Sequence, residues 1–267
     1  IKWFRLAADQ GDKIAQYNLG VAYEEGKGVK QEYIEATHWY LIAADQGYSI
    51  AQNKLGLCYE NGKGVEQNYV EAIKWYRLAA GRGNMNAQYN LGLKYDLGEG
   101  VKKDITKAIK WYRLAAGQGD MNAQYTLGLK YYFAEGIKQD YVEALSWFRL
   151  AANQGYTDAQ YNLGVMYEHG EGVQQDYAEA AKWYRLREDQ EYEYAHRINS
   201  ISSYEDFLAK HPKGAWYDNA VYYRDKVALD VAKKINTLEA FQTFLDKYPK
   251  SDWADQARYF KQYGAIE

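Results

Sequence analysis

A block of sequence that returns every 36 residues, as from Trp75 to Trp111, is the feature that most limits how this chain can fold. Its clearest copy spans residues 108–128, and a tryptophan and a Leu-Gly pair mark the same two places in successive copies. The tryptophans are Trp3, Trp39, Trp75, Trp111, Trp147 and Trp183, and the Leu-Gly pairs end at Gly20, Gly56, Gly92, Gly128 and Gly164. A fixed period of this size is typical of stacked helical hairpins. The repeat therefore predicts an all-α array.

Each repeat unit contains the pattern of two helices. Residues 1–11 match the second half of a unit, and five whole units follow at 12–47, 48–83, 84–119, 120–155 and 156–191. Ala87, Leu91 and Tyr95 recur at spacings of four, which predicts the first helix of their unit. A Gly-x-Gly-Val loop ends this helix, because glycine tolerates the left-handed conformation; the fourth unit departs from this with Ala134. The second helix is predicted to begin at an N-cap three residues before a glutamate, which is the case at Asn68, Asp140 and Asp176.

Constant small residues predict close contacts between these helices. Alanines and the glycine of the Leu-Gly pair recur where two helix axes must approach, and the tryptophan fills the wider gap between neighbouring pairs. Residues of mixed size at fixed positions indicate packing and not a catalytic pattern.

The array changes type near its C-terminal end. Glu191 stands where the next closing glycine would fall, so we expect the helix that begins near Asp176 to continue to about Ile198. A second repeat then begins, and its matching residues are Ile198 and Ile235, Asn199 and Asn236, and Pro212 and Pro249. Asn199 and Asn236 are predicted N-caps, and the prolines end the short helices that follow. The predicted division is residues 1–191, a repeat solenoid, and residues 192–267, helical hairpins that continue or cap it.

The units at residues 1 to about 190 resemble Sel1-like repeats, close relatives of the tetratricopeptide repeat. Leu19, Gly20 and Tyr23 form the Leu-Gly-x-x-Tyr of the tetratricopeptide pattern, although Gln16 stands where that pattern prefers Trp. The resemblance implies a right-handed α-solenoid of antiparallel helix pairs. It also implies a non-catalytic scaffold or adaptor that binds a protein or peptide on a concave face lined by the first helices.

The last two hairpins resemble tetratricopeptide units common in bacterial envelope and assembly lipoproteins. The resemblance rests on short phrases such as Phe244 to Ser251. It favours a periplasmic or secreted location, while a cytoplasmic one stays open.

Composition and motifs exclude several functional classes. With 33 basic and 36 acidic residues and a net charge of −3, no overall field favours nucleic acid. No apolar run approaches the roughly 18 residues of a membrane helix. Cys58 is the only cysteine, and the four histidines are scattered over different repeat positions, so neither zinc nor a cofactor has a ligand set. We expect no catalytic residue, because acid, base and nucleophile do not converge anywhere.

Recognition is expected in the residues that vary between units. On the first helices they lie opposite the constant face, with Lys94 and Lys130 at the edge of this stripe. The predicted partner-binding residues are Lys54, Asn86, Asn90, Lys94, Leu97, Asn122, Thr126, Lys130, Tyr132, Phe133 and Asn162. Amides bond an extended backbone, lysines attract carboxylates, and exposed aromatic residues supply anchors. We therefore predict a groove for an acidic or C-terminal peptide; the alternative is an ordinary solvated face.

Two other functions stay open at this stage. The 29 tyrosines and 8 tryptophans could stack on sugars in a glycan- or peptidoglycan-binding envelope protein, although most of them repeat in register, as packing residues do. The chain could also be a regulatory segment of a larger enzyme. Trp3, Phe4 and Leu6 lie in the half repeat and lack the first helix that would cover them, so we expect self-association there.

Overall fold

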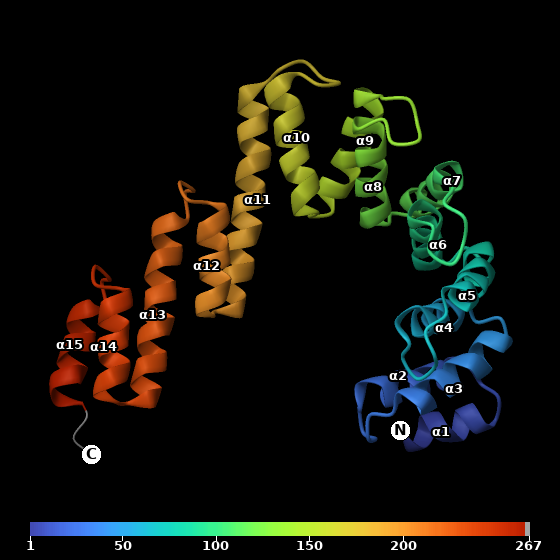
Figure 1. Ribbon diagram of the computed structural model, residues 1–267, viewed down its shortest axis with the longest axis horizontal. Coiled ribbons are helices and arrows are strands. Elements are labelled where there is room, and N and C mark those ends of the chain that lie inside the picture. Colours follow the sequence, from blue (N-terminus) through green and yellow to red (C-terminus); the bar gives the residue numbers. More distant parts are fainter. Residues whose placement is uncertain (265–267) are drawn as a thin grey trace. The chain divides into compact units, whose positions relative to one another are not determined.

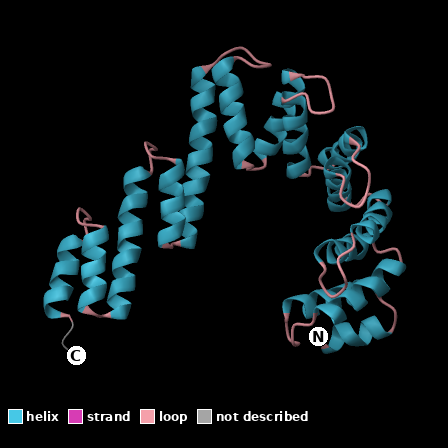
Figure 2. Ribbon diagram, viewed as in Figure 1, coloured by secondary structure: helices cyan, strands magenta, loops and turns pink. Residues whose placement is uncertain are grey.

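Helices make up the regular secondary structure of the part of the chain that the structure describes. The computed structural model describes residues 1–264, which form fifteen helices and no strand (Figures 1 and 2). Within residues 1–156, and again within residues 157–264, consecutive helices pack against each other as hairpins. The predicted all-α class is confirmed.

The helices follow the predicted repeat. The first helix of each unit, here called an A helix, is α2 (Lys13–Glu25), α4 (Ser49–Asn61), α6 (Met85–Leu97), α8 (Met121–Tyr132) or α10 (Thr157–His169). The second, here called a B helix, is α1 (Lys2–Asp9), α3 (Tyr33–Asp45), α5 (Tyr69–Gly81), α7 (Ile105–Gly117), α9 (Tyr141–Asn153) or α11 (Tyr177–Ile198). The C-terminal helices are α12 (Ile201–Lys210), α13 (Tyr217–Ile235), α14 (Leu238–Lys247) and α15 (Ala254–Tyr263).

The chain divides into two compact units. Unit 1 holds residues 1–156 together with the short loop at residues 171–173. Unit 2 holds residues 157–170 and the chain from residue 174 onward. The change of repeat type expected at residue 191 falls within α11, inside unit 2. The division of the chain by repeat type stays a prediction.

Left-handed residues end the A helices. Gly26, Gly62 and Gly98 cap α2, α4 and α6 with φ between 67° and 80°, as the loop motif predicts. In the fourth unit, α8 ends at Tyr132, and Ala134 adopts a φ of 59°. Left-handed backbone costs an L-residue with a Cβ atom about 1–2 kcal/mol, so this loop is strained where the others are not.

The predicted start and length of the B helices are confirmed. Asn68, Asp140 and Asp176 each accept hydrogen bonds from two backbone N–H groups in the first turn. The helix that begins after Asp176 runs to Ile198, because residues 187–191 offer no glycine to end it.

The predicted N-cap role of Asn199 and Asn236 is wrong. Both residues end the preceding helix in the left-handed conformation, with φ of 50° and 51°. The hydroxyls of Ser200 and Thr237 cap the helices that follow by accepting from the backbone N–H groups of Ser203 and Ala240. Asparagine is the residue after glycine that best tolerates this C-terminal position, and the hydroxyl residue beside it makes the better N-cap.

Close helix packing explains the constant glycine of each A helix. A Cβ atom added to Gly92 would lie 2.6 Å from Cε1 of the buried Tyr112 ring on α7, closer than real Cβ contacts allow. Gly20, Gly56, Gly128 and Gly164 face the equivalent ring in the same way. Trp75 packs against a cluster that includes Ala36 and Tyr40 of the preceding unit, which fits the predicted place of the tryptophan between pairs.

Candidate partner-binding site

Packing occupies the constant face of each A helix. In α6, Ala87, Gln88, Leu91, Gly92 and Tyr95 are buried. Gln88 donates from Nε2 to the carbonyl of Ala80, and its Oε1 accepts from Gln118 at 2.7 Å. The constant glutamine therefore joins successive hairpins and is not available to a partner.

The predicted binding residues differ widely in exposure. Asn86 and Asn122 are exposed. Leu97, the last residue of α6, and Phe133, which directly follows α8, occupy equivalent places and are each 60% exposed. The half-buried members are Lys54, Asn90, Thr126 and Tyr132 in unit 1, and Asn162 on α10 in unit 2. Lys94 and Lys130 are buried. The structure thus brings four of the predicted residues to the surface of α6 and α8.

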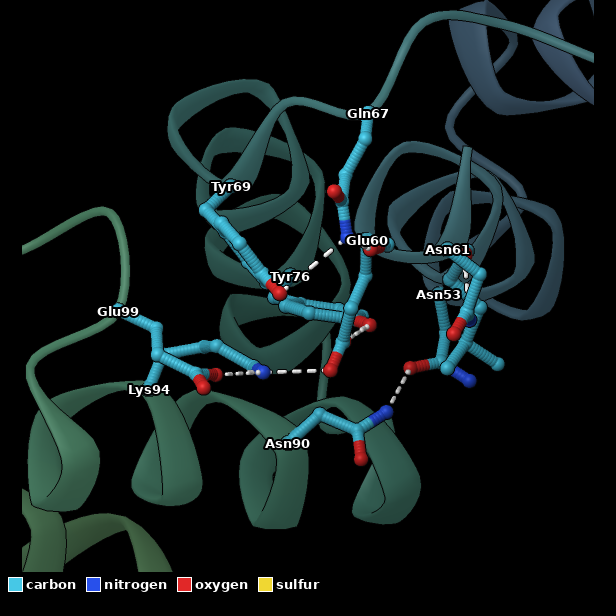
Figure 3. Close-up of polar contacts among 10 residues, drawn as sticks. Asn53, Glu60, Asn61, Gln67, Tyr69, Tyr76, Asn90, Lys94 and Glu99 are labelled. Carbon is cyan, nitrogen blue, oxygen red and sulfur yellow. Dashed lines mark hydrogen bonds and ion pairs between the residues drawn. The ribbon is translucent and has the colours of Figure 1, made fainter. Parts of the chain in front are cut away.

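Lys94 lies between two carboxylates (Figure 3). Its Nζ donates to Glu60 of α4 and, at 2.6 Å, to Glu99 of the following loop. Burial of Lys94 favours its neutral form, but the hydrogen bonds that Lys94 donates to the two carboxylates outweigh burial, and the pKa of Lys94 is raised. The sequence predicted Lys94 at the edge of a solvated stripe. The structure instead encloses the Lys94 side chain between α4 and the following loop.

Lys130 repeats this arrangement one unit later. It binds Asp96 of α6 and Glu135 of its own loop, each at 2.8 Å. Lys54 is less enclosed and pairs with Glu24 of α2 at 2.9 Å. All three predicted lysines therefore link neighbouring A helices through carboxylates of the chain itself. Their charge is already compensated before any partner arrives.

A tyrosine hydroxyl completes each carboxylate site. Tyr40 donates to Glu24 at 2.6 Å, Tyr76 donates to Glu60 (Figure 3), and Tyr112 donates to Asp96 at 3.2 Å. Burial and the neighbouring carboxylate raise the pKa of these three tyrosines, so they stay neutral donors.

The fourth unit replaces both members of this pair. Tyr132 takes the place of the acid, and Phe148 takes the place of the tyrosine that would donate to it. The two rings lie with centroids 6.4 Å apart, and the Tyr132 hydroxyl donates to Glu171 at 2.7 Å. An apolar contact thus replaces a hydrogen bond without leaving a buried donor unpaired.

Amides also bridge the A helices. Asn90 of α6 donates to the side-chain oxygen of the buried Asn53 on α4 at 3.1 Å (Figure 3). One of the predicted recognition amides therefore already has a partner within the chain, while Asn86 and Asn122 stay exposed.

A pattern in the sequence could have identified the paired lysines. Units with Ala22 or Cys58 at the lysine position carry Lys27 or Lys63 in the loop. The units with Lys94 and Lys130 carry an acid at that loop position instead, namely Glu99 and Glu135. In these four units the two positions change charge in opposite directions, which indicates a contact between them, whereas the fifth unit combines Met166 with Glu171.

Among the described residues, neither a metal-binding cluster nor an activated thiol is found. Within residues 1–264, no three His, Cys, Asp or Glu side chains gather in a way that could hold a metal ion. Cys58 is buried, and burial raises the pKa of its thiol, which opposes formation of a nucleophilic thiolate. In the same part of the chain, no helix combines the length and the apolar character needed to cross a bilayer.

A row of helical hairpins whose constant residues are used in packing defines an α-solenoid repeat protein. The Sel1 repeat family model matches residues 1–12, 13–48, 49–84, 86–120, 122–156 and 157–186. The chain belongs to the Sel1 repeat family, whose members generally mediate protein–protein interaction and are typically not enzymes. The predicted recognition is confirmed for the repeats, and the tail beyond residue 186 lies outside the family match.

Solved structures that are similar to this chain include two bacterial proteins. A Sel1 repeat protein from Oxalobacter formigenes shares 38% identity, with a TM-score of 0.64, over 67% of this chain and 73% of that one. The protein c5321, a protective antigen of uropathogenic Escherichia coli with an SLR fold, shares 31% identity with a TM-score of 0.69. That match covers 99% of this chain and 58% of the antigen. A search of the curated proteins found no match.

Proposed function

We propose that the chain is a non-catalytic scaffold that holds a segment of a partner protein on the exposed surface of α6 and α8. The residues that would touch this segment are Asn86, Leu97, Asn122 and Phe133, here called the α6–α8 surface. The observation that carries the proposal is the exposure of Leu97 and Phe133, each 60%, at the same place in consecutive units.

The neighbourhood of these two side chains supports an anchoring role. Leu97 follows Asp96, whose carboxylate binds Lys130 of α8, so the C-terminal turns of α6 and α8 are joined beside the two residues. Tyr132 packs edge-on against Phe133 with ring centroids 4.9 Å apart, which restricts the exposed ring. An aliphatic and an aromatic side chain on fixed helix ends give a partner apolar contact area at a low cost in entropy.

Amides rather than lysines supply the polar part of this surface. Asn86 and Asn122 occupy equivalent places in the first turns of α6 and α8 and are exposed. Their side chains can donate to and accept from the backbone of an extended segment. Because Lys94 and Lys130 are neutralised by internal carboxylates, a preference for acidic segments does not follow from this surface.

Peptide selection followed by paired variants tests the proposal. Peptides selected from a random display library on the wild-type chain would be measured by calorimetry against Leu97→Asn with Phe133→Asn. We expect binding about tenfold or more weaker, since each truncated anchor is worth on the order of 1 kcal/mol.

The control removes two exposed apolar side chains elsewhere. Val70 on α5 and Val142 on α9 are 52% and 61% exposed, and Val70→Asn with Val142→Asn should leave the affinity unchanged. Equal affinity of the wild type and the Leu97/Phe133 variant for every selected peptide would rule out the α6–α8 surface.

A further inference from the structure

The exposed face of α7 carries cations without acids. Thr106, Lys107, Lys110, Arg113, Leu114 and Gly117 form this face at helical spacing, and all six are exposed. The four other complete B helices have a glutamate where α7 has Lys107, namely Glu35, Glu71, Glu143 and Glu179. One change of residue thus turns the first turn of α7 from acidic to basic.

A tyrosine ring brings a cation of α5 to the same place. Arg77 donates from Nη2 to the Tyr95 hydroxyl at 2.8 Å, and its Cζ lies 5.9 Å from the centre of the ring. The Nζ of Lys107 lies 5.5 Å from the centre of the same ring. Arg113 donates in the same way to Tyr131 of α8. Arg77, Lys107, Lys110 and Arg113 therefore form one surface, here called the basic strip.

The charge of the basic strip is largely uncompensated. Tyrosine is a neutral acceptor, so Tyr95 and Tyr131 hold the two guanidinium groups in place without cancelling their charge. Across residues 1–264, Arg77, Lys110 and Arg113 form no ion pair with a carboxylate, and Lys107 pairs only with Asp104, at 3.1 Å. This contrasts with Lys54, Lys94 and Lys130, whose charges are used inside the array.

We infer that the basic strip is a second interaction surface, one that binds an acidic segment of a partner protein. Complementary charge is the first reason, because guanidinium groups held by tyrosines are preorganised for carboxylates. Exposed leucines are the second: Leu78 and Leu114 follow Arg77 and Arg113 and are 45% and 52% exposed. Cations beside aliphatic side chains fit a segment that alternates carboxylates with apolar residues better than they fit a phosphate backbone, which offers no apolar contact.

The test uses a labelled synthetic peptide rich in Glu and Leu, followed by fluorescence anisotropy at low and at physiological salt. The same peptide with Gln in place of Glu is the charge control for the ligand. Lys107→Gln with Lys110→Gln removes two exposed cations, and Lys107 gives up its contacts with Asp104 and the Tyr95 ring. Circular dichroism checks that the variant keeps the helix content of the wild type before binding is measured. We expect the Glu peptide to bind the wild type in a salt-dependent way and the variant about tenfold more weakly.

The residues for a matched control variant lie two repeats further along the chain. Lys182 and Arg185 of α11 occupy the positions of Lys110 and Arg113, but they pair with Glu179 and Asp189, each at 2.8 Å. Lys182→Gln with Arg185→Gln removes the same charge and should bind the Glu peptide as the wild type does.

Three results would overturn the inference. The first is equal binding of the Glu peptide by the wild type and the Lys107/Lys110 variant, and the second is an equal loss in the α11 variant. The third is binding of single-stranded DNA or of phosphatidylglycerol vesicles as strong as that of the Glu peptide, since that would show a surface for any polyanion. None of these results depends on Leu97 or Phe133, so the α6–α8 surface and the basic strip are tested separately.

Discussion

Lys94→Met should destabilise the array although the new side chain fits the site. Met166 is fully buried at the equivalent position of α10, so methionine can occupy this place in the repeat. The substitution removes the cation that binds Glu60 and Glu99 and leaves both carboxylates, with only Tyr76 still donating to Glu60.

The size of the loss follows from how far the two acids reach water. Removing one partner of a fully buried ion pair typically costs about 3–5 kcal/mol. The Lys94 side chain is only 4% exposed, but those of Glu60 and Glu99 are 23% and 38% exposed, so solvent can stabilise the acids in part. We therefore expect a loss of about 2 kcal/mol in the free energy of unfolding, between the values for buried and surface pairs.

Urea unfolding followed by circular dichroism, with hydrogen exchange of α4 to α6, measures this loss. Lys74→Met is the control, because Lys74 pairs with Glu71 on the surface and should contribute no more than about 0.5 kcal/mol. Adding Glu60→Gln and Glu99→Gln to Lys94→Met should restore most of the stability, since no unpaired charge remains. If Lys94→Met were as stable as Lys74→Met, the buried lysine would not hold α4 and α6 together.

Three further predictions concern single residues. Gly92→Ala should lower the free energy of unfolding by about 1–3 kcal/mol, because the new methyl group would clash with the Tyr112 ring; an unchanged melting temperature would contradict the close approach. Ala134→Gly should raise the free energy of unfolding by about 1 kcal/mol by relieving left-handed strain, and chemical denaturation would show no gain if the loop were relaxed. Glu24 is partly buried, which opposes its ionisation, but hydrogen bonds from Tyr40 and Lys54 outweigh burial and lower its pKa. The ionised group therefore stabilises the fold above about pH 4.5, and this contribution is lost as the pH falls through the lowered pKa. Thermal melts of Glu24→Gln should accordingly depend less on acid than those of the wild type, and parallel curves would refute this.

The positions of the helices were predictable because the same sequence signals recur in every repeat unit. Each unit repeats the same local signals. These are alanine, leucine and tyrosine at spacings of four, glycines that end helices, and Asp or Asn residues that begin them. Asn199 was misassigned because asparagine serves both at N-caps and in left-handed C-caps, and only the hydroxyl of Ser200 decides between the two.

The surface was predicted less well, because helical phase alone does not show what a neighbouring helix covers. Lys94 varies between units as a recognition residue would, yet its side chain lies against Glu60, 34 positions earlier in the chain. An arginine stands at the position of Arg77 in most units, which suggests a packing role. Arg77 is nevertheless exposed, and its guanidinium group lies beside Tyr95. Long side chains carry their charge away from the helix that bears them, so contacts between units, and not spacing within one helix, decide which cations are available.

A scan of all positions in α6 and α8 and of Phe133, scored in parallel for folded abundance and for binding of a selected peptide, tests the central claim most directly. Substitutions of repeated residues such as Leu91 and Gly92 should reduce abundance, whereas substitutions of Asn86, Leu97, Asn122 and Phe133 should reduce binding at normal abundance. A scan in which binding falls only as abundance falls, with no position affecting binding alone, would contradict the division between residues that build the array and residues that recognise a partner.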